Sequence, residues 1–142
     1  MNYLLDTDHI SFIQRRSGRE FATLTERISQ HSPTDFALSV ISFHEQVLGA
    51  HTFINRAQTK EEIIRGYNLL FQTLQGFSLA PVLPFDAEPI AIFDSLRTQG
   101  IRVSTMDLRI ASIALSHRLV LLTRNIRDFA KVPDLMMEDW TQ

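Results

Sequence analysis

The chain contains no cysteine, and this absence excludes disulfide bridges, thiolate metal sites and cysteine nucleophiles. Long apolar runs are missing as well, because no window approaches the roughly 18 apolar residues that a membrane-spanning helix needs. The N-terminus also lacks a basic segment followed by an apolar leader with a small-residue cleavage site. We therefore expect a soluble, cytoplasmic protein that makes no contact with a membrane.

An excess of positive charge is also missing. The formal net charge is −2, which argues against a protein that holds nucleic acid by bulk positive charge. Lysine is scarce: Lys60 and Lys131 are the only two, and every other basic residue is an arginine. The planar guanidinium group of arginine suits bidentate contacts with phosphate or carboxylate. Two groups of arginines stand out, although each is most simply a solvated face: Arg15, Arg16 and Arg19, and Arg118, Arg124 and Arg127.

The pattern of apolar and polar residues predicts a single domain over residues 1–142. The chain shows no repeat, linker or low-complexity segment. Strands and helices alternate along it, which predicts an α/β fold with a mainly parallel sheet covered on both faces. Strands are expected at 2–6, 36–41, 82–85, 119–122 and 135–137, and helices near 8–15, 19–30, 42–56, 59–76, 86–99 and 106–117. Ligands of such sheets bind at the carboxyl ends of the strands.

Two of the expected helices begin with a capping-box pattern. Ser42 and Glu45 have the Ser-x-x-Glu spacing in which the two side chains satisfy free backbone N–H groups, and Thr59 and Glu62 repeat it. Asp86 is placed to cap the helix that follows the third expected strand. These residues predict where the helices begin.

Four acidic residues lie at or just beyond the predicted carboxyl end of a strand, or in the helix turn entered from it. Each also has an ordinary structural explanation when taken by itself. Asp6 can cap the first helix, Glu45 can complete its capping box, Asp107 can face a helix dipole, and Asp128 can be a loop acid. Four such coincidences are less probable than one site, and we therefore predict that these acids converge.

A convergent group of carboxylates needs a cation or shared protons. Two carboxylates about 4 Å apart repel each other by roughly 4 kcal/mol at an effective dielectric constant of 20. Without cysteine, and without an HExxH motif, the oxygen-rich set favours Mg²⁺ or Mn²⁺ over zinc. His44 and His51 are seven residues apart on one helical face, a spacing that does not match a zinc site.

Several segments, taken in order, resemble PIN-domain ribonucleases of the VapC toxin type. The resemblance covers nearly the whole chain and rests on LLDTDHIS (4–11), VISFHEQVLGA (40–50), MDLRIASIA (106–114), LLTRNIRDF (121–129), Val132-Pro133 and Glu138-Asp139-Trp140. It implies a PIN-like three-layer α/β/α fold and a Mg²⁺-dependent endoribonuclease that cleaves RNA. It also implies a homodimer and a small cognate antitoxin that neutralises the enzyme.

Carried over residue by residue, the resemblance assigns Asp6, Glu45 and Asp107 to the acidic triad of the family. The fourth position is open, because some members have an acid where this chain has Asn125, and others have one where Asp128 stands. We expect Asp6 and Asp107 to be the main metal ligands, direct or through water, with Glu45 and Asp128 completing the pocket. In this hypothesis Thr7 and Asp8 orient Asp6 or bound water.

Two other functions compete with the ribonuclease hypothesis. A strand followed by Asp-x-Asp also fits the nucleophile motif of haloacid-dehalogenase-like phosphotransferases, but neither Lys60 nor Lys131 lies in the context which that chemistry needs. The second alternative is a PIN-like binding protein that has lost catalysis. Loss of catalysis should erode the acids first, and all three acids of the triad are present.

Overall fold

Five short parallel strands form the centre of the computed structural model, which describes residues 1–142. The strands are β1 (Tyr3–Leu5), β2 (Phe36–Ser39), β3 (Val82–Leu83), β4 (Val120–Leu122) and β5 (Met137–Glu138). Their order in the sheet is β3-β2-β1-β4-β5, and every neighbouring pair is parallel. The first strand of the chain is therefore the central one. Strands β2 and β3 lie on one side of it, and strands β4 and β5 lie on the other.

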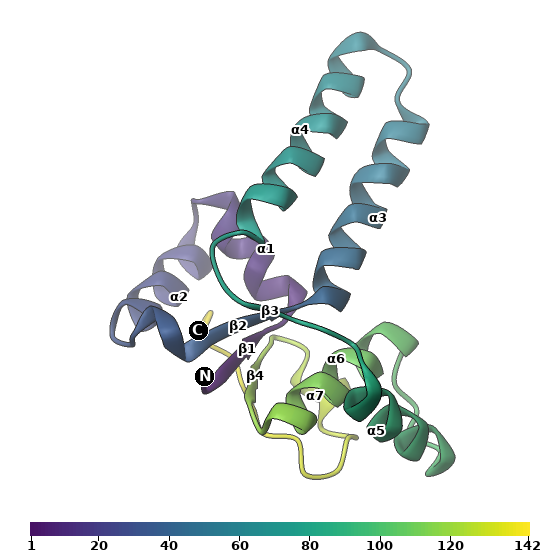
Figure 1. The fold of residues 1–142 in the computed structure, drawn as a ribbon. Helices are drawn as coiled ribbons and strands as arrows, with labels where there is room; N and C mark the ends of the chain where they lie inside the picture. Colours follow the sequence, from purple (N-terminus) through teal and green to yellow (C-terminus); the bar gives the residue numbers. More distant parts are fainter.

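Helices cover both faces of this sheet (Figure 1). They are α1 (Thr7–Arg15), α2 (Arg19–Ser29), α3 (Val40–Arg56), α4 (Lys60–Gly76), α5 (Ala87–Thr98), α6 (Thr105–His117) and α7 (Ile126–Phe129), and a 3₁₀ turn spans Pro33–Asp35. None of these helices combines the length and the apolar character that crossing a bilayer demands.

Two hydrophobic cores lie on opposite faces of the sheet, because successive side chains of a strand point to opposite faces. Leu4 and Leu121 belong to the core beneath α5, α6 and α7. Their neighbours Leu5 and Leu122 belong to the core beneath α1 and α2, together with Trp140. A parallel sheet buried on both faces in this way gives the three-layer α/β/α architecture that the sequence predicted.

The pair α3 and α4 forms a long antiparallel hairpin that projects from the body of the molecule (Figure 1). Its two helices approach closely at Gly66. A Cβ atom added to this residue would lie 2.5 Å from Ile54 Cγ1, so glycine is required for the close packing. Thr59 caps α4 as predicted, because its Oγ1 accepts a hydrogen bond from the N–H of Glu62 at 3.1 Å.

Some predicted boundaries were wrong. The second strand ends at Ser39, and Ser39 rather than Ser42 caps α3: its Oγ accepts a hydrogen bond from the N–H of Ser42 at 3.0 Å. Asp86 occupies the N-cap position of α5 but makes no side-chain cap bond. The last strand lies at 137–138 rather than 135–137. The sequence prediction missed α7, whose four residues are too few for helical periodicity to be visible.

Candidate active site

Asp6 and Thr123 meet where the central strands end. Asp6 directly follows β1 and Thr123 directly follows β4, and the last residues of these strands, Leu5 and Leu122, are register partners. Thr123 Oγ1 donates a hydrogen bond to Asp6 Oδ2 at 2.7 Å, and the N–H of Thr7 donates to Asp6 Oδ1 at 2.8 Å. Asp6 therefore caps α1 and also presents a buried carboxylate, 5% exposed, at the carboxyl edge of the sheet.

Glu45 belongs to the same edge through α1. Thr7 Oγ1 donates a 2.8 Å hydrogen bond to Glu45 Oε1 and lies 2.9 Å from Ser42 Oγ. Because Ser39 is the N-cap, Glu45 is in the second turn of α3 and does not take part in a capping box. The capping explanation of Glu45 was therefore wrong, and the side chain is held toward the start of α1.

Asp107, Asn125 and Asp128 approach from the other side of the sheet edge. Asp107 lies in the first turn of α6, where its N–H donates to Oγ of the N-cap Ser104 at 3.2 Å. Asn125 Nδ2 donates to Asp107 Oδ2 at 3.4 Å. Asp128, on α7, lies with its Oδ1 3.6 Å from Lys131 Nζ. Asn125 is thus in direct contact with the triad, whereas the neighbour of Asp128 within ion-pair distance is a lysine.

The carboxylates of this region share one electrostatic environment. The pKa of Asp6 is raised from 3.8 to about 7, first by burial and then by the charges of Asp8 and Asp107, while the hydrogen bonds from Thr123 and Thr7 lower it. The pKa of Glu45 is also raised, first by burial and then by the charge of Asp107, against the hydrogen bond from Thr7 and the nearby His44.

Asp107 is the member common to these interactions. Its pKa is raised, first by burial and then by the charges of Asp128 and Asp8, while the hydrogen bond with Ser104 lowers it. Asp6, Glu45, Asp107 and Asp128 therefore act on one another as a single acidic group, although they come from four separate segments of the chain. The charge of Asp107 reaches both Asp6 and Glu45, and the charge of Asp128 reaches Asp107; that the four form one catalytic and metal-binding site stays a prediction.

The donor chemistry of the group suits a hard divalent cation, because every candidate ligand is a carboxylate oxygen. No three acidic or imidazole side chains lie close enough together to chelate an ion directly. Both oxygens of Asp6 already accept hydrogen bonds, whereas Glu45 uses only Oε1 and Asp107 only Oδ2. The carboxylates repel one another, and a bound cation would relieve that repulsion.

A buried network joins the acidic group to the end of the chain. Asp8 Oδ2 accepts a hydrogen bond from the N–H of Arg124 at 2.9 Å, and Asp8 Oδ1 lies 2.7 Å from His9 Nδ1. His9 is completely buried, and its Nε2 accepts a hydrogen bond from the N–H of Trp140 at 3.2 Å. Since a backbone N–H only donates, the proton of the neutral ring lies on Nδ1 and points to Asp8.

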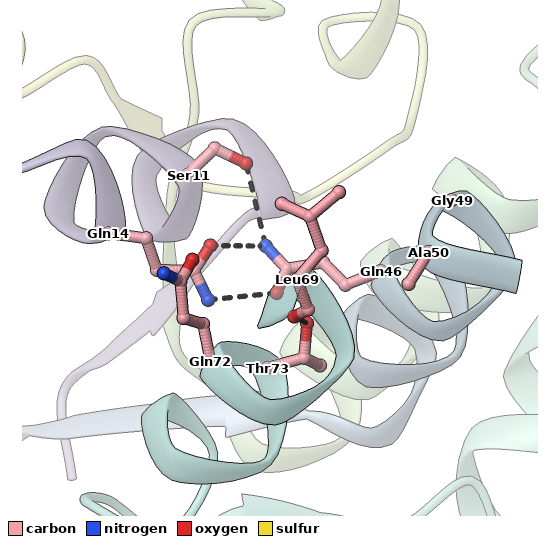
Figure 2. A pocket seen from close by; sticks show the side chains of 8 residues that line it. All are labelled: Ser11, Gln14, Gln46, Gly49, Ala50, Leu69, Gln72 and Thr73. Carbon is pink, nitrogen blue, oxygen red and sulfur yellow. Dashed lines mark hydrogen bonds between the residues drawn. The ribbon is translucent and has the colours of Figure 1, made fainter. Parts of the chain in front are cut away.

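Amide side chains fasten α1 to α3 at Gln46, the residue that follows Glu45 (Figure 2). Gln14 and Gln46 exchange two hydrogen bonds of 2.9 Å, and Gln46 Nε2 lies 3.5 Å from Ser11 Oγ. These residues line a cavity of about 230 Å³ that Leu69, Gln72 and Thr73 of α4 help to enclose. The cavity contains none of the acids, and the amide pair fixes the spacing between the two helices that carry Thr7 and Glu45.

Sequence reasoning missed the parts of the site that donate hydrogen bonds. Thr123 and His9 contribute side chains that hold the acids, yet neither was singled out for such a role. One signal was available for Thr123: it is a polar residue placed directly after a continuous apolar strand that the fold buries. No local signal predicted that His9 would contact Trp140, because that contact is purely tertiary.

Comparison with known proteins agrees with the geometry. The chain matches the family model described as PIN domain over residues 3–135. It is 31% identical over 148 residues to Ribonuclease VapC1 of Haemophilus influenzae strain R2866, and the match covers all of both chains. Ribonuclease VapC2 of Rickettsia felis is 24% identical, with 99% of this chain and 98% of that protein covered.

Solved structures with the same architecture include VapBC-1 and VapBC2. The structure of VapBC-1 from nontypeable Haemophilus influenzae is 30% identical, covers 100% of both chains and has a TM-score of 0.69. The structure of VapBC2 from Rickettsia felis, bound to a DNA fragment from their promoter, is 26% identical, covers 99% of both chains and has a TM-score of 0.73.

Proposed function

This chain belongs to the PIN domain family, among its VapC proteins, and on that premise we propose that it is a divalent-metal-dependent endoribonuclease. We propose further that it cleaves RNA phosphodiester bonds in the cytoplasm as the toxin of a toxin–antitoxin pair. The relatives named Ribonuclease VapC, which match the chain along its whole length, support this assignment.

A single observation carries the proposal: acids from separate segments raise one another's pKa at the carboxyl edge of the sheet, beside the central strand. Asp107 raises the pKa of both Asp6 and Glu45, and Asp128 raises that of Asp107. This edge is where ligands of open parallel sheets bind. Perturbed pKa values of this kind cluster at functional sites.

We propose that Asp6, Glu45, Asp107 and Asp128 hold Mg²⁺ or Mn²⁺, directly or through water. When bound, the ion would supply an activated water and would offset negative charge at the phosphodiester and the leaving oxygen. Asn125 can assist only through a neutral amide group, since it adds no charge to the pocket. Asp128 is therefore our candidate for the fourth acidic position.

The chain's own residues prepare the site in three ways. Thr123 and Thr7 hold the two oxygens of Asp6, so this carboxylate does not need to reorganise when substrate arrives. The same Thr7 holds one oxygen of Glu45 and leaves the other free. Asp6, with a pKa of about 7, exchanges its proton near neutral pH, and cation binding would therefore compete with protonation at this residue.

We propose three partners: single-stranded or looped RNA as the substrate, a small cognate antitoxin as the inhibitor, and a second copy of the chain. The related structures of VapBC-1 and VapBC2 support the antitoxin. An arginine of the antitoxin would fit the acidic group, since a guanidinium pairs with carboxylates in a planar, bidentate manner. The phosphotransferase and inactive-protein alternatives gain no support from these comparisons.

The test uses purified protein and two substrates, each with Mg²⁺ and with chelator. We expect cleavage of structured RNA with Mg²⁺, no cleavage with chelator, and no hydrolysis of a generic phosphomonoester under either condition. Asp107→Asn serves as the control for contaminating nuclease, because it removes one metal-binding charge and keeps the side-chain shape. RNA cleavage that persists undiminished in folded Asp107→Asn, or in chelator, would contradict the proposal. Sequencing of the RNA ends would identify the preferred cleavage sites.

A further inference from the structure

Two arginines from distant parts of the chain share one aromatic ring beside the acidic group. Arg15 Cζ lies 5.0 Å from the centroid of the Phe12 ring, and Arg124 Cζ lies 5.4 Å from the same centroid. These arginines belong to the two separate basic groups noted in the sequence. Both side chains are exposed, and neither guanidinium forms an ion pair with a carboxylate. Both positive charges therefore remain available to a ligand.

The ring and its arginines lie along a surface track, which we define as the face of α1 that runs from Asp8 to Arg15. Asp8, Phe12 and Arg15 lie at i, i+4 and i+7 of α1, and so they share one face of that helix. A rise of 1.5 Å per residue places Phe12 about 6 Å and Arg15 about 10 Å beyond Asp8 along the helix axis. Arg124 reaches the track from the other side, because its backbone N–H donates to Asp8 Oδ2 at 2.9 Å.

A second ring of the same kind shows what is particular to Phe12. Arg97 and Arg109 lie with their Cζ atoms 5.5 Å and 5.6 Å from the centroid of Phe93. Phe93, however, is only 6% exposed and belongs to the core beneath α5 and α6. Phe12 is partly exposed and packs only at the margin of the other core. The Phe12 group is thus the one that offers both an aromatic surface and two free guanidiniums.

We propose that Phe12, Arg15 and Arg124 form a subsite that binds the single-stranded part of an RNA substrate adjacent to the bond that is cleaved. The two guanidinium groups contact phosphates of the flanking nucleotides, and a base stacks on the ring or on a guanidinium plane. Single-stranded nucleic acid is bound elsewhere by the same combination of cations and aromatic side chains. The proposal rests on the ribonuclease function, because it assigns the position of that enzyme's substrate.

An acidic protein segment is the competing occupant of this surface, since carboxylates also pair with arginine. The exposed ring favours RNA, because every base has a face that can stack on it, whereas an acidic side chain gains nothing from an aromatic surface. The location favours RNA as well. A substrate phosphodiester that reaches the acids must bring its neighbouring phosphates with it, and these need cations to offset repulsion by the carboxylates.

The experiment measures binding without cleavage. A labelled single-stranded oligoribonucleotide is titrated in chelator with wild type, Arg15→Gln, Arg124→Gln, Phe12→Leu and the matched control Arg97→Gln. We expect each of the two arginine variants to bind about three- to tenfold more weakly, with the slope of log affinity against log salt smaller by about 0.7 for each lost phosphate contact. Phe12→Leu should bind at least about fivefold more weakly, as expected for a lost stacking surface. Arg97→Gln should match wild type in affinity and in slope.

Several results would overturn the subsite. The first is that Arg15→Gln and Arg124→Gln retain wild-type affinity and salt slope. The second is that Arg97→Gln loses as much RNA affinity as they do, and the third is that wild type binds no RNA. A poly-glutamate peptide provides a further test. If wild type binds this peptide, and the two arginine variants no longer bind it but still bind RNA with wild-type affinity, the surface belongs to an acidic protein segment. Thermal unfolding checks the fold of Phe12→Leu, and the arginine variants decide the question if that variant is unstable.

The ribonuclease function can fail separately. If wild type binds RNA through this subsite but never cleaves it with Mg²⁺, the subsite stands and the proposed activity fails. If wild type cleaves RNA while the arginine variants keep wild-type affinity, KM and salt slope, the activity stands and the subsite fails.

Discussion

The hydroxyl of Thr123 and the carboxylate of Asp6 form a 2.7 Å hydrogen bond between residues 117 apart in sequence. The bond joins the ends of two neighbouring strands. Burial raises the pKa of Asp6, and this hydrogen bond lowers it. Thr123 thus favours the charged form of Asp6, which is the form that binds a cation.

Removing this hydroxyl should alter the pH dependence of cleavage. In Thr123→Val the charged form of Asp6 loses a donor, so the pKa of Asp6 should rise above about 7. We expect the rise of the cleavage rate with pH to shift to higher pH, and Thr123→Ser to restore the wild-type profile because serine keeps the donor. A pH–rate profile of kcat/KM for the three proteins measures this. Superimposable profiles would contradict the role assigned to Thr123.

Asp6 should destabilise the folded protein above neutral pH. Its folded pKa is about 7 and its ordinary value is 3.8, so between these values the folded state binds more protons than the unfolded state. The free energy of unfolding should therefore fall as pH rises from about 4 to 7, and stay constant above that range. A difference of roughly three pH units corresponds to up to about 4 kcal/mol.

Asp6→Asn tests this expectation, because asparagine also caps helices well. We expect the variant to be more stable than wild type at pH 8 and to lose that advantage as pH falls toward 4. Urea unfolding at both pH values measures the difference. A variant that is less stable than wild type at pH 8 would show that the carboxylate stabilises the fold in its charged form.

Glu45→Gln should separate chemistry from folding. Because Ser39 caps α3, the glutamate has no capping role to lose, and glutamine can still accept the hydrogen bond from Thr7. We expect the melting temperature to stay the same or to rise slightly, because burial disfavours the charged glutamate and glutamine carries no charge. Cleavage should fall to background. If the variant cleaves RNA at the wild-type rate, Glu45 is not part of the acidic site.

A titration with Mg²⁺ should distinguish Asp128 from Asn125. In Asp128→Asn the pocket loses a charge, so cleavage should need more Mg²⁺ and should be partly rescued at high concentration. Asn125→Ala removes the 3.4 Å contact with Asp107 but no charge, and it should cost less. Lys131→Gln is a control, because it frees Asp128 from its lysine neighbour and should not weaken Mg²⁺ binding. A wild-type titration for Asp128→Asn together with inactive Asn125→Ala would assign the fourth position to the amide.

His9 should stabilise the protein through both ring nitrogens. His9→Asn keeps a donor near Asp8 but leaves the N–H of Trp140 without an acceptor, whereas His9→Gln can keep that acceptor and lose the contact with Asp8. An unsatisfied buried group costs about 1–3 kcal/mol, and we expect a loss of that size in His9→Asn by urea unfolding. Only His9→Gln should also slow cleavage, because it frees Asp8. Wild-type stability in His9→Asn would contradict the buried network.

The parallel sheet and the grouping of acids were predictable because both follow from local patterns. Apolar runs alternate with amphipathic segments, and Asp6 stands directly after the end of such a run. Asp6 needed no further information, since parallel strands bring their carboxyl ends to one edge. Asp107 is different, because it lies at the start of α6, which follows α5 and not a strand. The start of α3 was harder to predict, because Ser39 and Ser42 are both good caps and only the burial of the strand end selects the first.

The remaining parts of the site depend on contacts that no local pattern encodes. Asn125 contacts Asp107, whereas Asp128 does not. This difference depends on α7, a single turn of helix whose sequence shows no helical periodicity. The meeting of Arg15 with Arg124 at one ring requires the packing of α1 against the end of β4. In the sequence these arginines belonged to two separate groups, and each group was adequately explained as a solvated face.

The central position of β1 also determines when, during synthesis, the sheet around Asp6 can form. The strand that carries Asp6 leaves the ribosome first, but its neighbour β4 and the donor Thr123 are made more than a hundred residues later. At about 5–20 residues per second, synthesis of that interval takes on the order of ten seconds. During this time the nascent chain contains Asp6 and then Glu45, but it lacks β4 and the Thr123 hydroxyl that holds the Asp6 carboxylate. If the proposed ribonuclease function is correct, a chain interrupted before β4 should not cleave RNA, because the hydrogen bond that holds Asp6 forms only when most of the chain has been made.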